Sequence, residues 1–346
     1  MPRVTLKDVA EQAGVSFKTV SRVINHEPNV ASVTSQKVNK AIADLHYVPN
    51  VAARSLSRGK AKAIALVTGW PINHPYTGAL IDQCFEESNR NGYSMVLFSL
   101  SSGIDRKISD AFLGRQVDGI VMDTKVAEDD ELIRQLTAMN VPYVVIHPNR
   151  KSGRITASFI QIDNIEATRQ AINYLIKLGH RTIGYINPQS GLVHDDERLH
   201  GYRLALEEAG IKPCDNWIYS GTTAYFTMAL SGTSLLLRNN PEMTAIFAAT
   251  DDIAMGVVSA VWQMGLKVPD DISVVGFDDI TYATMTTPPL TTIHQPIDEI
   301  ARTAVSHLIS LIEDPGTPHI DLVMPTHLVI RDTCRAPRSV PTLVSV

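Results

Sequence analysis

The N-terminal stretch from Thr5 to Asn25, TLKDVAEQAGVSFKTVSRVIN, constrains the fold of this chain more than any other segment. Its apolar residues recur at helical spacing on both sides of Gly14, which predicts two short helices joined by a tight turn. Thr5 and Asp8 have the spacing of a capping box, and Ser16 is placed to cap the second helix. The outward side of that helix carries long hydrogen-bond donors and one aromatic ring, namely Phe17, Lys18, Ser21 and Arg22. Such a face suits the major groove of DNA.

Charge separates this N-terminal region from the rest of the chain. Residues 1–60 hold nine Lys and Arg against four Asp and Glu, a net charge of +5. The remaining 286 residues hold 22 against 32, so the whole chain of 346 residues carries a formal charge of −5. A basic head on an acidic body places any attraction to phosphate at the N-terminus, although charge alone also fits an ordinary solvated surface.

Two further helical segments follow the first pair. After a loop from Asn25 to Ser32, a third helix is predicted from Thr34 or Ser35 to about Leu45, which closes a small three-helix core. A short helix is then predicted over residues 51–57, and a helix of this length forms only when something packs against it. Its Ala53 and Leu56 lie beside Arg54, the pattern of an apolar wedge that enters a minor groove. An ordinary linker helix is the alternative.

From Ala61 onward, apolar runs alternate with helical segments. The first series has strands predicted at 64–67, 95–98, 119–122 and 143–146, with helices near 77–91, 105–116 and 129–139. The second has strands at 159–162, 183–186, 245–248 and 272–275, with helices near 165–178, 196–209, 224–238 and 252–265. A strand at 290–294 and a helix at 297–312 are expected to cross back to the first series. This alternation predicts two lobes of doubly wound parallel sheet that enclose a cleft.

The sequence lacks the motifs of several functional classes. The three cysteines, Cys84, Cys214 and Cys334, have no metal-ligand spacing, so we expect a reducing compartment, no metal and no cofactor. A signal-peptide core and a membrane-spanning apolar run are both missing, which predicts a cytoplasmic protein. The sequence contains no P-loop, GxGxxG after a strand, GxSxG or HExxH, which argues against an enzyme. The adjacent carboxylates Asp195-Asp196 and Asp251-Asp252 are expected to be solvated or to cap helices, and simple packing is one interpretation of Trp70.

Five segments together resemble the LacI/GalR family of bacterial transcriptional regulators. They are VTLKDVAEQAGVSFKTVSRVIN, YVPNVAARSL, ERLHGY, SVVGFDD and PPLTTIHQP, and the likeness runs in order from Val4 to about Arg331. The resemblance implies a helix-turn-helix DNA-binding domain over 1–47, a hinge helix and linker over 48–60, and an effector-binding and dimerisation core over 61–346. That core is similar to periplasmic binding proteins, with a first lobe of about 61–160 and 292–325 and a second of about 161–291 and 326–335.

The family likeness implies a sequence-specific repressor that binds pseudo-palindromic operator DNA as a homodimer. A small effector in the cleft, a sugar or sugar derivative, would control its operator affinity; a purine- or nucleoside-responsive or activating regulator is the alternative. No heptad repeat follows the core, which favours a dimer over a coiled-coil tetramer. A solute-binding protein and an α/β enzyme are rivals from other classes. The missing signal peptide and the basic head argue against the first, and the missing catalytic motifs argue against the second.

The resemblance also assigns residues to DNA binding. Phe17, Lys18 and Arg22 match the base-contacting positions, although Lys18 could touch phosphate alone. The residues assigned to positioning on the DNA backbone are Thr5, Ser16, Thr19, Ser21 and Asn25. Those assigned to the hinge and the minor groove are Asn50, Ala53, Arg54 and Leu56.

For the effector, the resemblance points first to Arg198 in ERLHG and Asp278 in GFDD. A donor-rich arginine opposite an acceptor carboxylate suits a polyhydroxylated ligand, and Tyr76 is placed to stack on a sugar face. The further candidates are Asp123, His147, Thr223, Thr250, Asp252 and Gln295. Thr250, Glu166 and His147 depart from the residues usual in the family, which bears on the effector rather than on the fold.

Overall fold

The structure, a computed structural model, describes residues 4–24, 30–47, 61–99, 110, 114, 116–123, 130–148, 157–189, 191–221 and 225–338. The chain divides into two compact units, Met1–Lys62 and Ala63–Val346. Several predicted features lie outside the described residues: the hinge helix with Asn50, Ala53, Arg54 and Leu56, most of the helix near 105–116, and the side chains of Asn25 and Thr223.

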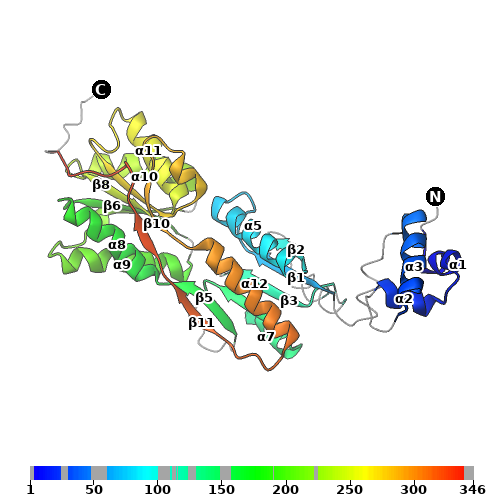
Figure 1. Cartoon of the computed structure of the whole chain (residues 1–346). Coiled ribbons are helices and arrows are strands. Elements are labelled where there is room, and N and C mark those ends of the chain that lie inside the picture. Colours follow the sequence, from blue (N-terminus) through cyan, green and yellow to red (C-terminus); the bar gives the residue numbers. More distant parts are fainter. Residues whose placement is uncertain are drawn as a thin grey trace. The chain divides into compact units, whose positions relative to one another are not determined.

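The first unit contains helices α1 (Leu6–Ala13), α2 (Phe17–Ile24) and α3 (Ser32–Asp44) (Figure 1). The capping box is confirmed, because the carboxylate of Asp8 accepts hydrogen bonds from the backbone N of Thr5 at 2.7 Å and from its hydroxyl at 2.8 Å. Gly14 ends α1 with a φ of 65°, the left-handed conformation that glycine adopts without strain. The small core beneath these helices consists of Val9, Ala10, Val20, Val23, Val38, Ala41 and Tyr47.

The second unit contains two six-stranded sheets, and each sheet forms one lobe. The first lobe has the strand order β11-β5-β4-β3-β1-β2, and the second has β12-β10-β9-β8-β6-β7. All neighbours are parallel except β10 and β12. The first-lobe strands are β1 (Ala63–Thr68), β2 (Ser94–Ser99), β3 (Gly119–Asp123), β4 (Tyr143–Ile146), β5 (Ser158–Ile162) and β11 (Asp321–Met324). The second-lobe strands are β6 (Ile183–Pro188), β7 (Ile218–Gly221), β8 (Ala245–Ala248), β9 (Ser273–Asp278), β10 (Thr291–His294) and β12 (His327–Val329).

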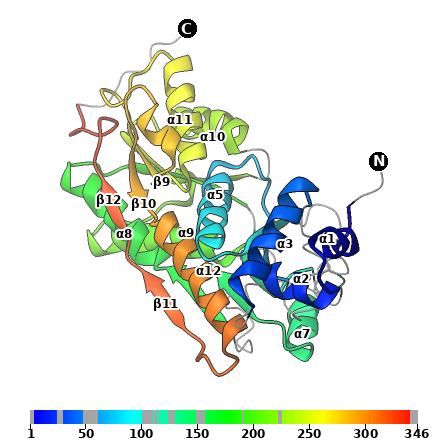
Figure 2. The same cartoon turned by 45° about the vertical axis from the view of Figure 1, so that its right-hand side comes forward.

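Helices cover the sheets. In the first lobe, α5 (Pro75–Arg90) and α12 (Ile297–Glu313) lie side by side, and the Ser306 hydroxyl on α12 donates to Glu87 Oε1 on α5 at 3.1 Å (Figures 1 and 2). This lobe also contains α7 (Asp130–Ala138). In the second lobe, α8 and α9 pack together, as do α10 and α11. Their bounds are α8 (Asn164–Lys177), α9 (Val193–Glu208), α10 (Tyr225–Asn239) and α11 (Asp251–Gln263), with short 3-10 turns at Asp215–Trp217 and Thr281–Thr284.

The chain passes between the lobes after β5, after β10 and after β11. Two predictions about this path are wrong. The strand at 159–162 was grouped with the second series, but β5 pairs with β4 and β11 in the first sheet. The strand at 290–294 was expected to cross back together with the helix that follows it. Instead, β10 pairs with β9 and β12 in the second sheet, and of these two elements only the helix, α12, lies in the first lobe. Apolar runs mark a buried strand without specifying which strand lies beside it.

A glycine allows α8 and α9 to approach closely. A Cβ atom at Gly201 on α9 would lie 2.5 Å from the carbonyl oxygen of Ile165 and 3.0 Å from Cβ of Thr168, both on α8. We therefore expect Gly201→Val to force these helices apart and to lower the free energy of unfolding by about 1–3 kcal/mol. Urea unfolding checks this result, with His200→Ala on the exposed side of α9 as the control. An unchanged unfolding midpoint in Gly201→Val would contradict the packing.

Candidate functional site

The outer face of α2 presents a polar surface on a rigid base. Phe17 is 53% exposed and Lys18 is exposed, whereas Ser21 and Arg22 are half-buried. Val20 and Val23 anchor the opposite side of the helix in the core. The arrangement holds a short helix rigidly and leaves its first turn accessible, as groove recognition requires.

Two of the polar residues assigned to the DNA backbone also cap helices. Ser16 Oγ accepts from the backbone N of Thr19 at 3.1 Å and lies 2.8 Å from the Thr19 hydroxyl. Thr5 belongs to the capping box of α1. These residues therefore start both helices as well as lying at their N-termini, where backbone N–H groups attract anions such as phosphate.

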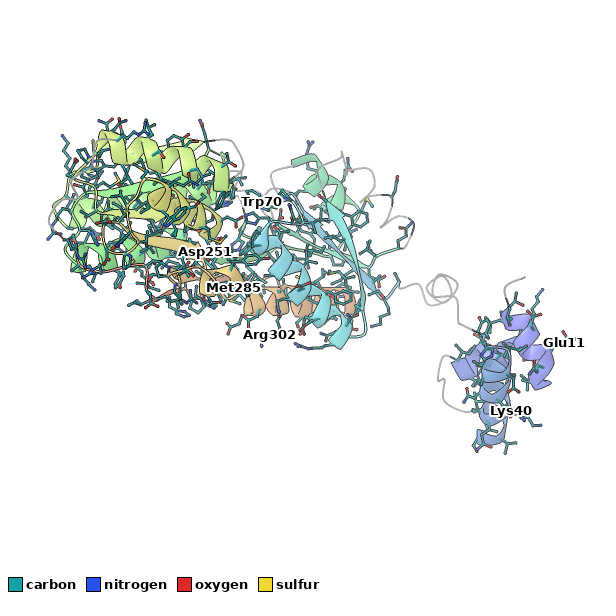
Figure 3. The ribbon with its side chains drawn as sticks, turned by 90° about the horizontal axis from the view of Figure 1, so that it is seen from above. Glu11, Lys40, Trp70, Asp251, Met285 and Arg302 are labelled. Atoms are coloured by element: carbon teal, nitrogen blue, oxygen red, sulfur yellow. The ribbon has the colours of Figure 1, made fainter. Side chains whose placement is uncertain are left out.

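The second unit contains a cavity of about 660 Å³, measured to its open mouth, between the two lobes. Clefts between two lobes are places where small molecules commonly bind. Figure 3 shows Trp70 where the lobes meet. The described residues that line the cavity are Trp70, His74, Tyr76, Thr77, Leu80, Asp123, His147, Asn164, His194, Asp195, Arg198, Tyr225, Thr250, Asp278 and Gln295. A smaller recess adjoins it behind His147, Asn164 and His194.

The first-lobe wall is formed where strands β1, β3 and β4 end. The carboxylate of Asp123 accepts from the Thr68 hydroxyl and from the backbone N of Gly69 at 3.1 Å, which fixes its orientation. The Tyr76 hydroxyl lies 2.6 Å from Nε2 of His147. Burial and the charge of Arg198 lower the pKa of His147 to about 3, so its ring is neutral.

The second-lobe wall is organised around Arg198 on α9. Its Nε donates to Asn164 Oδ1 at 3.1 Å and its Nη1 to the carbonyl of Ala249 at 2.6 Å. The guanidinium carbon lies 3.7 Å from the centre of the Phe277 ring. Hydrogen bonds and ring stacking together fix the plane of the guanidinium group. Arg198 is thus a preorganised donor at the cavity wall.

The floor of the cavity lies at a crossover between the lobes. Asp278 ends β9, and Gln295 follows β10 where the chain returns to the first lobe. Nε2 of Gln295 donates to Asp278 Oδ1 at 2.6 Å. Burial raises the pKa of Asp278 to about 7, although Arg198 and the Gln295 hydrogen bond favour its charged form. This carboxyl group therefore changes charge near neutral pH.

Four aromatic rings meet at the mouth of the cavity. Trp70 and His74 come from the first lobe, and His194 and Tyr225 come from the second. The Trp70 ring stacks on that of His74 with centroids 5.9 Å apart, and the Tyr225 ring meets both edge-on at 6.4 and 5.6 Å. His74 Nε2 lies 3.8 Å from the Asp252 carboxylate. The cluster bridges the lobes and offers flat apolar faces to a ligand.

Most of the residues assigned to the effector from the resemblance lie at one place. The seven that line the cavity are Tyr76, Asp123, His147, Arg198, Thr250, Asp278 and Gln295. The Thr250 hydroxyl also caps α11, because it accepts from the backbone N of Ile253 at 3.3 Å. Asp252 is not among the lining residues but lies beside His74.

Other lining residues escaped the sequence reasoning. Asp195 was expected to be solvated or to cap a helix; instead it is buried in the cavity wall. Asp251, which was expected to behave similarly, does not line the cavity but is also buried; it accepts from the Thr292 hydroxyl at 2.5 Å and from the backbone N of Ile280 at 2.9 Å. Asp195 and His194 lie three and four residues before Arg198, on the same face of α9, and this spacing was the available signal. Trp70, for which simple packing was one interpretation, lines the cavity.

The part of the chain that the structure describes contains neither a membrane-spanning helix nor a group of metal ligands. No helix there is long and apolar enough to cross a membrane. No three His, Cys, Asp or Glu side chains within it are grouped so that they could hold a metal ion.

Comparison with known proteins identifies both units. Residues 5–50 match the family of bacterial regulatory proteins called the lacI family, and residues 172–334 match the periplasmic binding protein-like domain. The HTH-type transcriptional regulator CelR of Thermobifida fusca is 34% identical, with 96% of this chain and 98% of CelR covered. The HTH-type transcriptional repressor PurR of Vibrio campbellii is also 34% identical, with 96% and 98% covered.

Solved structures agree. A lac repressor dimer bound to operator and the anti-inducer ONPF has a TM-score of 0.84 and 29% identity, with 97% of this chain and all of that chain covered. A CelR–cellobiose complex has a TM-score of 0.70 and 32% identity, with 96% and 100% covered. These relatives are transcription regulators rather than enzymes. This chain belongs to the LacI family and is a DNA-binding transcriptional regulator controlled by a small effector.

Proposed function

We propose that the protein is a repressor whose operator affinity is controlled by a sugar or sugar derivative in the interlobe cavity. The observation that carries this proposal is the fixed Arg198 donor and the Asp278 acceptor in one cavity with aromatic faces at its mouth. A polyhydroxylated ring needs donors, acceptors and a flat apolar surface at once. The cellobiose complex of CelR supports the sugar, and the purine alternative remains because PurR is similar to the same extent.

On the DNA side, we assign base contacts to Phe17, Lys18 and Arg22. Positioning on the DNA backbone falls to Thr5, Ser16, Thr19, Ser21 and Asn25, and the minor-groove contacts fall to Asn50, Ala53, Arg54 and Leu56. The partner is a pseudo-palindromic operator bound by a homodimer, as the solved lac repressor dimer on its operator supports. Effector binding shifts the population between a core arrangement that pairs the two hinge segments and one that does not.

An electrophoretic mobility shift on the DNA upstream of the protein's own gene tests the proposal. A panel of neutral sugars and of purine bases and nucleosides is added to the preformed complex. Release of DNA by a sugar supports a sugar-induced repressor. Tighter binding with a purine would replace this assignment with a purine-responsive one.

The base contacts are tested by Arg22→Ala. A bidentate arginine–guanine contact contributes about 1–3 kcal/mol of discrimination, so the variant should lose on the order of 10- to 100-fold in operator affinity and tolerate substitution at one base pair. Lys18→Ala is the comparison. If Lys18 touches only phosphate, that variant binds all sequences proportionally less well, and the slope of log affinity against log salt falls by about 1. Unchanged operator affinity in Arg22→Ala would contradict the assignment.

A further inference from the structure

The cavity wall carries more negative than positive groups. Its described lining residues include the carboxyl groups of Asp123, Asp195 and Asp278, and Arg198 is the only Lys or Arg among them. The three lining histidines add no positive charge near neutral pH. Burial lowers the pKa of His74, His147 and His194, and the lowering is large for His147 and His194.

Polar atoms without a partner among the described residues also point to the ligand. Thr77, which is 2% exposed, has an unpaired hydroxyl, and Gln295, which is 3% exposed, has an unpaired Oε1. The Oε1 atom of Gln295 is an amide oxygen and can only accept, while the amide nitrogen beside it already donates to Asp278. Buried acceptors of this kind need a donor from whatever occupies the cavity. A hydroxyl group can donate, whereas a carboxylate or an ionised phosphate oxygen cannot.

Arg198 offsets only one of the three lining carboxylates. Its Nε atom is bonded to Asn164 and one Nη1 hydrogen to Ala249, so a carboxylate cannot form the side-on fork through Nε and Nη2. The donors that remain, one hydrogen on Nη1 and two on Nη2, are left for ligand oxygens, including the lone pairs of hydroxyl groups.

We propose that this cavity selects uncharged, hydroxyl-rich ligands and rejects anionic sugar derivatives such as uronates and sugar phosphates. The inference rests on the proposed sugar effector and names its charge class. The lining carboxylates outnumber the one lining arginine, and a ligand anion about 6 Å from one carboxylate, at an effective dielectric constant of about 20, is repelled by an amount worth on the order of 100-fold in affinity. The unpaired oxygens of Thr77 and Gln295 also disfavour an anionic ligand, because an anionic group presents another acceptor where a donor is needed.

Isothermal titration calorimetry of the full-length protein at pH 8, where Asp278 is ionised, tests this proposal. The probes are matched pairs: neutral pyranoses and disaccharides of glucose, galactose and mannose, against the corresponding uronic acids and 6-phosphates. The expected result is that a neutral member binds and its anionic partners bind at least about 100-fold more weakly. An anion that binds as tightly as its neutral partner overturns the charge selection and leaves the sugar effector standing. If no sugar binds in either form, both proposals fail.

A variant separates charge from shape. Asp252 is partly exposed and its carboxylate lies beside His74, so Asp252→Asn removes one negative charge near the cavity mouth with little change in packing. The affinity ratio of the neutral to the anionic ligand should fall several-fold in this variant. Asp196→Asn, on the exposed side of α9, is the matched control and should leave the ratio unchanged. Equal ratios in Asp252→Asn and the wild type would mean that charge does not set the selectivity, which would overturn the proposal.

Discussion

Replacing Asp278 by Asn is expected to weaken effector binding by about 100-fold while leaving operator binding intact. The substitution keeps the shape of the side chain but exchanges one acceptor oxygen for an N–H₂ donor. Either Gln295 or the ligand then meets a donor where it requires an acceptor. A buried hydrogen bond to a charged group contributes about 1.5–3 kcal/mol, and leaving its partner unsatisfied adds to that loss. In cells, the variant of the proposed sugar-induced repressor should remain bound to its operator when the sugar is present.

Calorimetry with the effector and a mobility shift with operator DNA check the two halves of this prediction separately. Asp279→Asn is the matched control, because this neighbouring carboxylate is not among the residues that line the cavity. It accepts from Arg331 Nη2 at 2.6 Å and lies 2.9 Å from Nδ1 of His294. Loss of this pair should lower stability with little change in effector affinity. Equal effector affinities for Asp278→Asn and the wild type would remove Asp278 from the site.

We expect ligand binding to be coupled to lobe movement through two buried residues at the crossovers. Gln295 lies at the crossover after β10, and Asn164 begins α8 just after the crossover that follows β5. Both are buried, and both bond to the groups expected to hold the ligand, Asp278 and Arg198. A ligand that binds Asp278 and Arg198 is therefore expected to shift the segments that join the lobes, because Gln295 and Asn164 in those segments are hydrogen-bonded to them. Closure around a ligand by small changes at such segments is a common switching movement.

Local structure was predictable from sequence where it depends on neighbours along the chain. The spacing of Thr5 from Asp8 and the position of Gly14 predicted the ends of α1, and both are confirmed. The alternation of apolar runs with helices predicted most strands of both sheets. β7, β11 and β12 were missed because these edge strands are partly exposed and lack a buried apolar run.

The cavity was only partly predictable. Arg198 and Asp278 were found because motifs mark them, and the ends of neighbouring parallel strands bring Asp123 and His147 to one edge. The aromatic cluster was missed because Trp70 and Tyr225 come from different lobes. Their approach depends on how the lobes close, which no pattern within one segment specifies. The burial of Asp195 is also a tertiary property, since adjacent acidic residues at a helix start read equally well as solvated.

Effector affinity is expected to fall as the pH is lowered below about 7, by up to about tenfold per pH unit. Asp278 has its pKa raised to about 7 by burial. A ligand hydroxyl that donates to this carboxylate favours its charged form, so the complex has a lower pKa and binding releases a proton. Above pH 7 the group is already ionised and the affinity levels off. The lining His147 and His194 have lowered pKa values and stay neutral across this range, so they do not produce the same slope.

Stability without effector should change in the opposite direction. Because the pKa of Asp278 is higher in the folded chain than in the unfolded chain, where it lies near 3.8, folding takes up a proton between these values. The contribution of this group to stability is therefore fully present below pH 4 and is lost as the pH rises through 7. Thermal unfolding of the free protein should show this decline, and Asp278→Asn should make it shallower; the buried Asp251, whose pKa burial also raises, contributes a decline of its own.

Calorimetry in buffers of different ionisation enthalpy between pH 5.5 and 8 measures the proton release directly. The groups that act on Asp278 besides Arg198 and Gln295 include Asp252 and Asp195, and burial also raises the pKa of Asp252. Asp252→Asn therefore separates the two carboxyl groups: the slope should survive in Asp252→Asn and disappear in Asp278→Asn. A slope that survives in Asp278→Asn would place the titrating group elsewhere. Burial raises the pKa of both Asp251 and Asp278, so falling stability alone does not separate them. Rising affinity that disappears in Asp278→Asn identifies Asp278 as the carboxyl group that the ligand, rather than the fold, holds in its charged form.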